Sequence, residues 1–410
     1  MKKTLKNWLG FLSLTLLLTI VYSCANDDAD YPPFSPTVSF NFEIDSSSPL
    51  TVHFTSKTTN AMEVNWDFGD GNTSSEANPT HSYASDGEYT VVLTINGEPG
   101  TTPAAQTKSV IVKEGVVVEL DGKIIGHEGS WDGVNGLVNA AFDGDLSTFV
   151  DAPMGTGGFV GYDFGIGSSI TLSSVKYAPR DGWAWRLVNG EIRGSNDPTF
   201  SNYTVLYTIA QEPATGTLTE AQISGNEGFR FIYFQSPVDG YCNIAELEFY
   251  GEVDFGVVNM NNWTVQQVSP GVTTTLTDNT INFNGTGGWS GSHIFQQVNV
   301  EAGTYQLSGL VKVNSVIDET WSELIFSTVE PQEGQDYVPG IPYQVVYSTW
   351  NGSPKVPAMY DLGEVNAGGE YPADGVYTFN APESFYIVIK SGSNQPYNLT
   401  WNNISLRKIN

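Results

Sequence analysis

The stretch "EVNWDFGDG", residues 63–71, decides how the first part of the chain is interpreted. Trp66 and Phe68 alternate with polar residues, which is the period of a β-strand that buries one face. Asp70 and Gly71 then provide the small residues of a tight turn, where bulkier side chains would be strained. The stretch therefore predicts a strand with one buried face, followed directly by a turn.

A second stretch continues this pattern within residues 36–114. In "SDGEYTVVLTI", Tyr89, Val91 and Leu93 repeat the period of two, and we expect them on the facing sheet. Together, "WDFGDG" and "SDGEYTVVLTI" resemble a polycystic kidney disease (PKD) domain, an immunoglobulin-like β-sandwich. The block is predicted to be a spacer. Its conspicuous acids are interpreted as turn formers and not as a metal or catalytic set: Asp67, Asp70 and Asp86.

The whole chain of 410 residues is predicted to be all-β. Charged residues make up only 15% of it, while Gly and aromatic residues are plentiful. Beyond the N-terminal segment, no stretch sustains the apolar spacing of an amphipathic helix. Short alternating runs fall into three blocks, 36–114, 116–252 and 254–410, with only short connections such as "KEG" and "GEVDFG" between them. The prediction is three β-sandwich modules in a row.

The charge of the chain is strongly acidic. It carries 45 acidic and 17 basic side chains, and three of the basic ones lie in the first 23 residues, which leaves a formal charge of about −31 beyond them. Such a surface repels phosphate backbones, so nucleic acid is excluded as an expected partner. Polyanionic glycans are disfavoured for the same reason.

Residues 1–23 have the parts of an export signal. Three lysines precede an apolar run that ends at a small residue, and Cys24 follows at once. This arrangement resembles the lipobox of bacterial lipoproteins, which implies lipidation of Cys24 and a membrane anchor through lipid alone. The alternative is an ordinary secretory peptide with an incidental cysteine. The tether, residues 24–35, resembles the surface-export signal of Bacteroidota-type lipoproteins through its acids, Asp27, Asp28 and Asp30.

The second block, residues 116–252, contains "AAFDGDLSTFVDAP" and ends in "CNIAELEFYG". With "FVGYDFG" and "GEIRGSND", these stretches resemble a coagulation factor 5/8 type C, or discoidin, domain, a jelly roll shared with family-32 carbohydrate-binding modules. The resemblance implies a structural Ca²⁺ ion, for which hard oxygen donors are suited. An empty loop is the alternative. The implied ligands are Asp143, Asp145, Thr148 and Glu246.

The same block contains "PRDGWAWRLVNG", in which Trp183 and Trp185 are expected to be exposed and are bracketed by Arg180 and Arg186. Indole faces pack against sugar C–H groups and guanidinium groups donate to hydroxyls, so these four residues are candidate glycan contacts. The alternative, that the two arginines only brace the loop, stays open.

The third block, residues 254–410, resembles the jelly-roll carbohydrate-binding modules of families 4 and 16. The resemblance rests on strand order and on the placement of aromatic residues. Trp263 and Trp401 lie inside predicted strands and are expected in the core. The other aromatics lie in or beside Gly- and Pro-rich loops and are candidate glycan-binding residues: Trp289, Trp321, Trp350, Tyr337 and Tyr343.

Three functions compete: a surface glycan-binding lipoprotein, an adhesion or spacer protein, and a secreted glycoside hydrolase or lyase. Glycosidases need paired carboxylates. The nearest pair, Glu246 and Glu248, shares a strand that closes a binding-module fold, so no enzyme activity is predicted. The leading hypothesis is an outer-membrane, cell-surface lipoprotein that captures a polysaccharide, a neutral glucan such as laminarin. By resemblance to starch-utilisation-type systems, its partners would be a TonB-dependent transporter and the transporter's glycan-binding lid lipoprotein.

Overall fold

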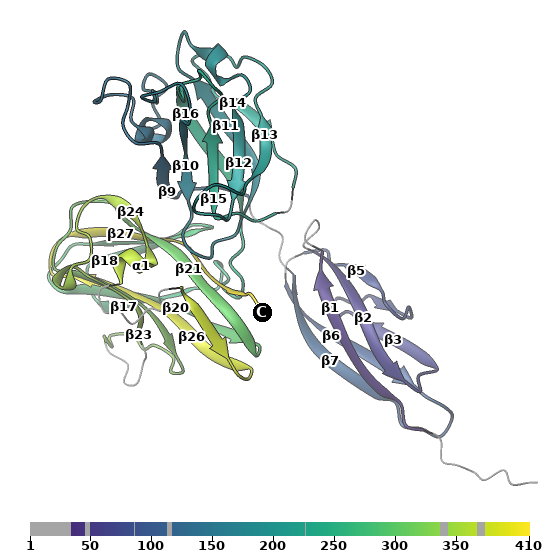
Figure 1. The fold of residues 1–410 in the computed structure, drawn as a ribbon. Coiled ribbons are helices and arrows are strands. Elements are labelled where there is room, and N and C mark those ends of the chain that lie inside the picture. Colours follow the sequence, from purple (N-terminus) through teal and green to yellow (C-terminus); the bar gives the residue numbers. More distant parts are fainter. Residues whose placement is uncertain are drawn as a thin grey trace, which may run out of the picture. The chain divides into compact units, whose positions relative to one another are not determined.

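The computed structural model describes residues 34–45, 50–85, 87–112, 117–225, 227–336, 343–366 and 374–410. Nearly all of its regular structure is β-strand (Figure 1), which confirms the all-β prediction. The chain divides into two compact units, Met1–Glu114 and Gly115–Asn410. Several residues singled out above lie outside the described residues: the leader, Cys24, the acids of the tether, Asp86 and Tyr337.

The first unit is a sandwich of two antiparallel sheets. One sheet consists of β1 (Thr37–Ile44), β2 (Thr51–Thr59) and β5 (Thr80–Ser82). The other consists of β4 (Thr73–Ser74), β3 (Glu63–Asp67), β6 (Gly87–Asn96) and β7 (Ala104–Val112). Trp66 is fully buried between the sheets, with its ring centroid 5.0 Å from that of Phe40 and 5.2 Å from that of Phe54. The inward alternation predicted for "WDFGDG" is confirmed.

One detail of that prediction is wrong. Tyr89, Val91 and Leu93 do not lie on the sheet that faces Trp66, because they belong to β6, which pairs directly with β3. Leu93 is the cross-strand partner of Trp66. A period of two reports which face of a strand is buried, but it does not report which sheet the strand joins. That choice depends on long-range pairing.

The acids that follow Trp66 form turns. The Oδ1 atom of Asp67 accepts from the backbone N–H of Gly69 at 2.9 Å. The Oδ1 atom of Asp70 accepts from the backbone N–H of Asn72 at 3.0 Å. Carboxylates that hold the backbone two residues ahead are ordinary turn chemistry. These contacts agree with the structural interpretation of the acids.

The second unit begins with a sandwich of a five-stranded and a four-stranded sheet. The larger sheet has the order β13 (Thr204–Thr208), β12 (Glu191–Ser195), β15 (Phe231–Gln235), β10 (Phe159–Asp163) and β9 (Lys123–Gly126). The smaller has the order β14 (Thr219–Gln222), β11 (Ile170–Pro179), β16 (Ile244–Val253) and β8 (Val118–Glu119). Two short 3₁₀ helices, η1 (Val138–Phe142) and η2 (Ala184–Leu187), lie in its loops.

The last part of the chain forms a third sandwich. One sheet has the order β17 (Thr264–Ser269), β20 (Ser290–Val300), β26 (Glu383–Ser393), β22 (Thr320–Ser327) and β23 (Tyr343–Ser348). The other has the order β18 (Val272–Leu276), β19 (Thr280–Gly285), β27 (Tyr397–Lys408), β21 (Gly303–Val313) and β24 (Ala358–Asp361), and β25 (Val376–Phe379) also pairs with β21. A 3₁₀ helix, η3 (Thr349–Asn351), and a one-turn helix, α1 (Leu362–Val365), complete it.

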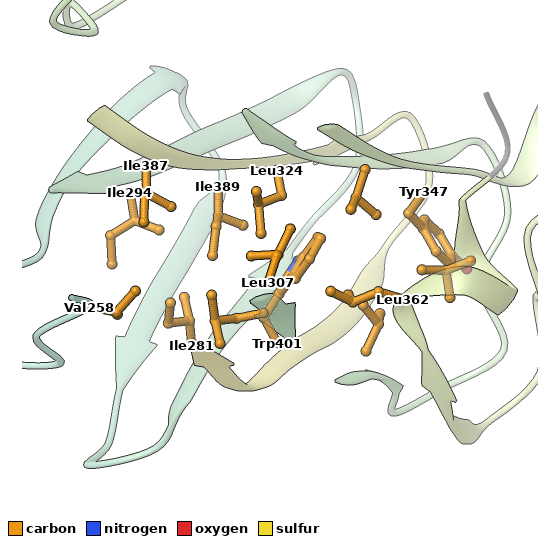
Figure 2. Close-up of a cluster of buried hydrophobic side chains, with 14 of the residues drawn as sticks. Val258, Ile281, Ile294, Leu307, Leu324, Tyr347, Leu362, Ile387, Ile389 and Trp401 are labelled. Atoms are coloured by element: carbon orange, nitrogen blue, oxygen red, sulfur yellow. The ribbon is translucent and has the colours of Figure 1, made fainter. Parts of the chain in front are cut away.

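The core of the third sandwich lies between these two sheets (Figure 2). Trp401 is fully buried there, and its Nε1–H donates to the hydroxyl of Ser322 at 2.9 Å. Trp263 differs from the prediction, because it immediately precedes β17 and is only half-buried against the core. Its indole N–H contacts the sulfur of Met260 at 3.5 Å.

The second and third sandwiches share one compact unit, although the sequence predicts separate modules. Several of their contacts are polar. The side chain of Arg407 donates to the backbone carbonyl of Gly167, where a Cβ atom would come within 2.1 Å of the Gln306 side chain. Ion pairs also connect the two sandwiches: Lys312 with Asp121 at 2.5 Å and Lys123 with Glu364 at 2.6 Å. Such isolated charges follow no periodic pattern that a sequence would reveal.

Candidate functional site

Three tryptophans meet at one edge of the sheet β17-β20-β26-β22-β23. Trp289 immediately precedes β20, Trp321 is the second residue of β22, and Trp350 lies in η3, which follows β23. Because neighbouring strands of this sheet are antiparallel, the starts of β20 and β22 and the end of β23 lie at the same edge. Trp289 and Trp350, which are 61 positions apart in the sequence, therefore lie at one surface together with Trp321.

The three indole rings form a contiguous surface, which we call the tryptophan platform (Trp289, Trp321 and Trp350). Their ring centroids are 6.2 to 6.4 Å apart, and the planes of Trp289 and Trp350 are nearly parallel, at 6°. Trp289 is 59% exposed and Trp350 is 50% exposed, whereas Trp321 is half-buried. Exposed aromatic rings of this kind offer flat apolar faces to a ligand.

The local backbone is adapted to hold these rings. Gly392 is the cross-strand partner of Trp321, and a Cβ atom there would come within 2.4 Å of the Trp321 ring. Trp289 has a left-handed backbone with φ of +62°. For a residue other than glycine this conformation costs roughly 1–2 kcal/mol. The hydroxyl of Ser269 donates to the Trp289 carbonyl at 2.7 Å, which helps to hold the strained residue.

The structure does not describe the side chains of the two predicted tyrosines. Tyr343 is the first residue of β23, where its backbone pairs with Ile325, but its side chain lies outside what the structure describes. Tyr337 lies outside the described residues altogether. Both stay predictions.

The second sandwich contains a cavity of about 640 Å³ near η1. Its lining combines exposed aromatic surface with polar side chains. Trp131, Asp132 and Asn135 come from the loop before η1, and Arg180 comes from the end of β11. Asp132 is fixed by the backbone N–H groups of Val134 and Asn135, and these hydrogen bonds lower the pKa of its carboxyl group to about 2.

The two predicted arginines have different environments. Arg180 lines the cavity, pairs with Asp151 at 2.8 Å, and lies 3.8 Å from the centroid of the Phe149 ring. Arg186 is stacked between two rings, with its guanidinium 3.9 Å from the centroid of Trp183 and 4.6 Å from that of Tyr241. Cation–π contacts of this kind fix a guanidinium in place.

Contacts within the protein therefore hold Arg186 in this loop, and its role in glycan binding stays a prediction. Arg186 also donates to the Asn243 side chain at 2.7 Å, a further contact within the protein. The two tryptophans beside it keep exposed surface, 36% for Trp183 and 51% for Trp185, so the predicted exposure is confirmed. Of the four predicted residues, Arg180 is the one that lines the cavity.

The sequence reasoning missed Trp131. Its ring is 64% exposed and packs edge-on against Tyr241, with 5.6 Å between the ring centroids. The signal was present, because "GSWDGVNG" places Trp131 among glycines in the same way as the loop around Trp289. The same criterion would have identified both residues.

The four predicted calcium ligands form a hydrogen-bonded loop. The Thr148 hydroxyl donates to the Asp143 carboxylate at 2.8 Å, and the N–H of Gly144 donates to Glu246 at 2.9 Å. Asp145 accepts from Ser147 at 2.6 Å. Among the described residues, no group of three His, Cys, Asp or Glu side chains is arranged to hold a metal ion. Calcium binding stays a prediction.

Glu246, which lies on β16 beside this loop, has a raised pKa. It is 5% exposed, and its burial, together with the nearby negative charge of Asp143, raises its pKa to about 7. Glu248, two residues along β16, accepts from the hydroxyl of Tyr250 at 2.7 Å and pairs with Lys176 at 3.6 Å. Both carboxylates are therefore engaged within the protein.

Comparison with known proteins defines the class of the first unit. Residues 35–112 match the PKD domain family. This match confirms the resemblance predicted from "WDFGDG".

Among curated proteins, the chain is similar to Collagenase ColQ1 of Bacillus cereus, with 25% identity over 248 residues, 56% of this chain and 23% of that protein. Collagenase ColA of the same species is 55% identical over 49 residues, 12% of this chain and 5% of that protein. Pre-pro-metalloprotease PrtV of Vibrio cholerae is 30% identical over 98 residues, 24% of this chain and 11% of that protein. The chain spans less than a quarter of the length of these relatives.

Solved structures with similarity include the carbohydrate-binding module CBM62 from Clostridium thermocellum Xyl5A, which is 39% identical. The match covers 33% of this chain and 98% of that module, with a TM-score of 0.33. The PKD1 domain of the Vibrio cholerae metalloprotease PrtV is 29% identical over 20% of this chain and 100% of that domain, with a TM-score of 0.18. A SusE-like protein is 14% identical over 50% of this chain and 94% of that protein, with a TM-score of 0.27.

Proposed function

We propose that the chain is a non-catalytic polysaccharide-binding protein. The observation that carries the proposal is the tryptophan platform, in which three indole rings from separate strand ends meet within 6.2 to 6.4 Å of one another. Sugar rings offer C–H faces that pack on indole, and their hydroxyls bond to polar neighbours. Retardation of the full chain in native gels that contain neutral glucans tests the proposal. A chain that no neutral glucan retards would contradict it.

The ligand is a neutral glucan, with a β-glucan such as laminarin as the best candidate. A polyanionic glycan needs a basic surface to offset the acidic charge of the protein. In the third sandwich, four of the five basic side chains are engaged with acids: Lys312 with Asp121, Lys355 with Asp318, Lys390 with Glu323, and Arg407 with Asp254. The pairings leave little free positive charge for an acidic polymer. The cavity lined by Trp131 and Arg180 is a second, smaller surface for the same class of ligand.

The protein works at the cell surface as a lipid-anchored outer-membrane lipoprotein, beside a TonB-dependent transporter and its glycan-binding lid lipoprotein. The leader, Cys24 and the acids after it support this part of the proposal. In the part of the chain that the structure describes, none of the helices has the length and apolar character that crossing a membrane requires.

Anchoring is expected to depend on Cys24. Cys24→Ser should move the protein from membrane fractions to the soluble fraction, because a lipidated cysteine would be the anchor. Cys242→Ser is the matched control. Cys242 is buried in the second sandwich, so its replacement should leave the protein in the membrane fraction. Fractionation with immunoblotting reads the result. A Cys24→Ser protein that still floats with membranes would overturn the lipoprotein assignment.

A structural calcium ion would be held by Asp143, Asp145, Thr148 and Glu246. Burial, and to a smaller extent the charge of Asp143, raises the pKa of Glu246, and a divalent cation would favour the charged form of both carboxylates. When bound, the ion would supply stability to the loop and no chemistry.

Chelation should therefore lower the melting temperature of the full chain, because an ion that binds only the folded state stabilises it by about 2.7 kcal/mol at a hundred times its Kd. Asp143→Ala should abolish the difference between calcium and chelator. Asp197→Ala, in a turn elsewhere in this sandwich, should preserve it. Identical melting curves of the unmutated chain with calcium and with chelator would remove the site.

A further inference from the structure

A polar cluster lies beside the tryptophan platform at the same edge of the sheet. Glu319 immediately precedes β22, and Asn394 and Gln395 immediately follow β26. The backbone N–H of Asn394 donates to the Glu319 carbonyl at 3.0 Å, and the N–H of Gly288 donates to the Asn394 carbonyl at 2.8 Å. These bonds continue the strand ladder one position beyond its last pairs. They set Trp289, Asn394 and Glu319 side by side.

The side chains of this cluster are oriented by one another. The Oε2 atom of Glu319 accepts from Asn394 Nδ2 at 2.6 Å and from Gln395 Nε2 at 3.0 Å. An ionised carboxylate only accepts, so both amides must turn an NH₂ group toward it. Their carbonyl oxygens, together with the Oε1 atom of Glu319, are then presented as acceptors. We call these three residues the acceptor rim.

The backbone is strained at one residue of the rim and at one residue of the platform. Trp289 has φ of +62° and Glu319 has φ of +47°, and neither residue is glycine. Left-handed conformations in residues of this size persist only where the surrounding structure holds them, and they concentrate at ligand-binding sites. Glu319 and Asn394 are half-buried and Gln395 is exposed, so the rim borders solvent beside the rings.

We infer that Glu319 determines the specificity of the platform for neutral, polyhydroxylated sugars, an inference that rests on the proposed function. A ligand at an acceptor-rich rim must donate hydrogen bonds, which sugar hydroxyls do. A uronate or sulfate group brings further acceptors and negative charge against the Glu319 carboxylate, and both are unfavourable. The neighbouring acid Asp318 contributes no side-chain acceptor to the rim, because its Oδ1 atom pairs with Lys355 at 2.7 Å and accepts from the backbone N–H of Glu319 at 2.8 Å.

The test compares Glu319→Gln with Asp318→Asn in the full chain. Both changes remove one negative charge at adjacent positions, but only the first changes a side chain of the rim, and the Oδ1 atom of an asparagine at 318 can still accept from the backbone N–H of Glu319. Native gels containing laminarin or alginate measure the apparent affinity of each variant, and thermal melting reports folding. Loss of a hydrogen bond to a charged group predicts about tenfold weaker laminarin binding for Glu319→Gln. In Glu319→Gln, the ratio of laminarin affinity to alginate affinity should also fall. The laminarin affinity of Asp318→Asn should stay within about twofold of that of the unmutated chain.

The outcomes separate the two proposals. Unchanged laminarin binding by Glu319→Gln, or an equal loss in Asp318→Asn, would refute the role of the rim while leaving glycan binding intact. An unmutated chain that binds no neutral glucan would refute the proposed function and the rim with it. If Glu319→Gln melts at a lower temperature, Gln395→Ala becomes the test of the rim. Gln395 is exposed, so its replacement removes one acceptor of the rim without disturbing buried contacts. It should weaken laminarin binding about threefold, and unchanged binding would count against the rim.

Discussion

Replacing Trp289 with glycine should weaken laminarin binding by at least about fivefold without unfolding the protein. Stacking of one aromatic ring on a planar ligand contributes about 1–3 kcal/mol, by analogy with base stacking, so loss of the ring should reduce affinity by about five- to 150-fold. The ring is 59% exposed, and its main packing partners are the other rings of the platform. Its removal therefore opens no cavity in the core.

The stability of this variant carries a second expectation. Glycine adopts φ of +62° without the penalty that other residues incur, whereas Trp289→Ala keeps that penalty. Both variants should lose affinity equally, but the glycine variant should melt a few degrees above the alanine variant, as expected for a difference of about 1 kcal/mol. Affinity gels and thermal melts of the two proteins measure this. Normal laminarin binding by either variant would show that Trp289 does not contact the ligand.

Replacing Trp401 with alanine should have the opposite signature, a large loss of stability. Trp401 is fully buried between the sheets of the third sandwich (Figure 2). Truncation of a buried Trp costs about 3–5 kcal/mol, through lost transfer energy and the cavity that remains. It also removes the donor to the Ser322 hydroxyl, which is itself buried. Denaturant unfolding of the full chain should show an early transition.

The early transition should belong to the second unit, because the first unit has its own core around Trp66. Intrinsic fluorescence combined with limited proteolysis can separate the two units. Trp401→Phe, which keeps most of the apolar volume, should recover more than half of the lost stability. An unfolding curve of Trp401→Ala that superimposes on that of the unmutated chain would contradict the described core.

The fold class was predictable because strands with one buried face leave a period of two in the sequence. Trp66 and Phe68 gave that signal, and the structure buries both. Sheet membership was not predictable, as Leu93 shows by pairing with Trp66 in one sheet. The ion pairs between the second and third sandwiches could not be predicted either, because surface charges such as Lys312 and Asp121 carry no periodicity.

The sequence predicted which tryptophans of the candidate site are exposed, but it did not predict that they lie together. Glycine-flanked tryptophans indicated exposed rings, and Trp289 and Trp350 are indeed exposed. That they meet follows only from the register of four strands, which a single sequence does not encode locally. The contact of Arg186 with Tyr241 could not be predicted locally, because Tyr241 lies 55 residues further along the chain.

The most direct test of the account is affinity electrophoresis of the full chain and two double variants in gels with and without laminarin. Trp289→Ala with Trp350→Ala removes the two exposed rings of the platform, and Trp183→Ala with Trp185→Ala is the matched control in the second sandwich. The account predicts that laminarin retards the unmutated chain and the control variant, while the platform variant migrates as it does without glucan and keeps its melting temperature to within a few degrees. Equal retardation of the platform variant, or loss of retardation only in the control variant, would contradict the assignment of glycan binding to the platform.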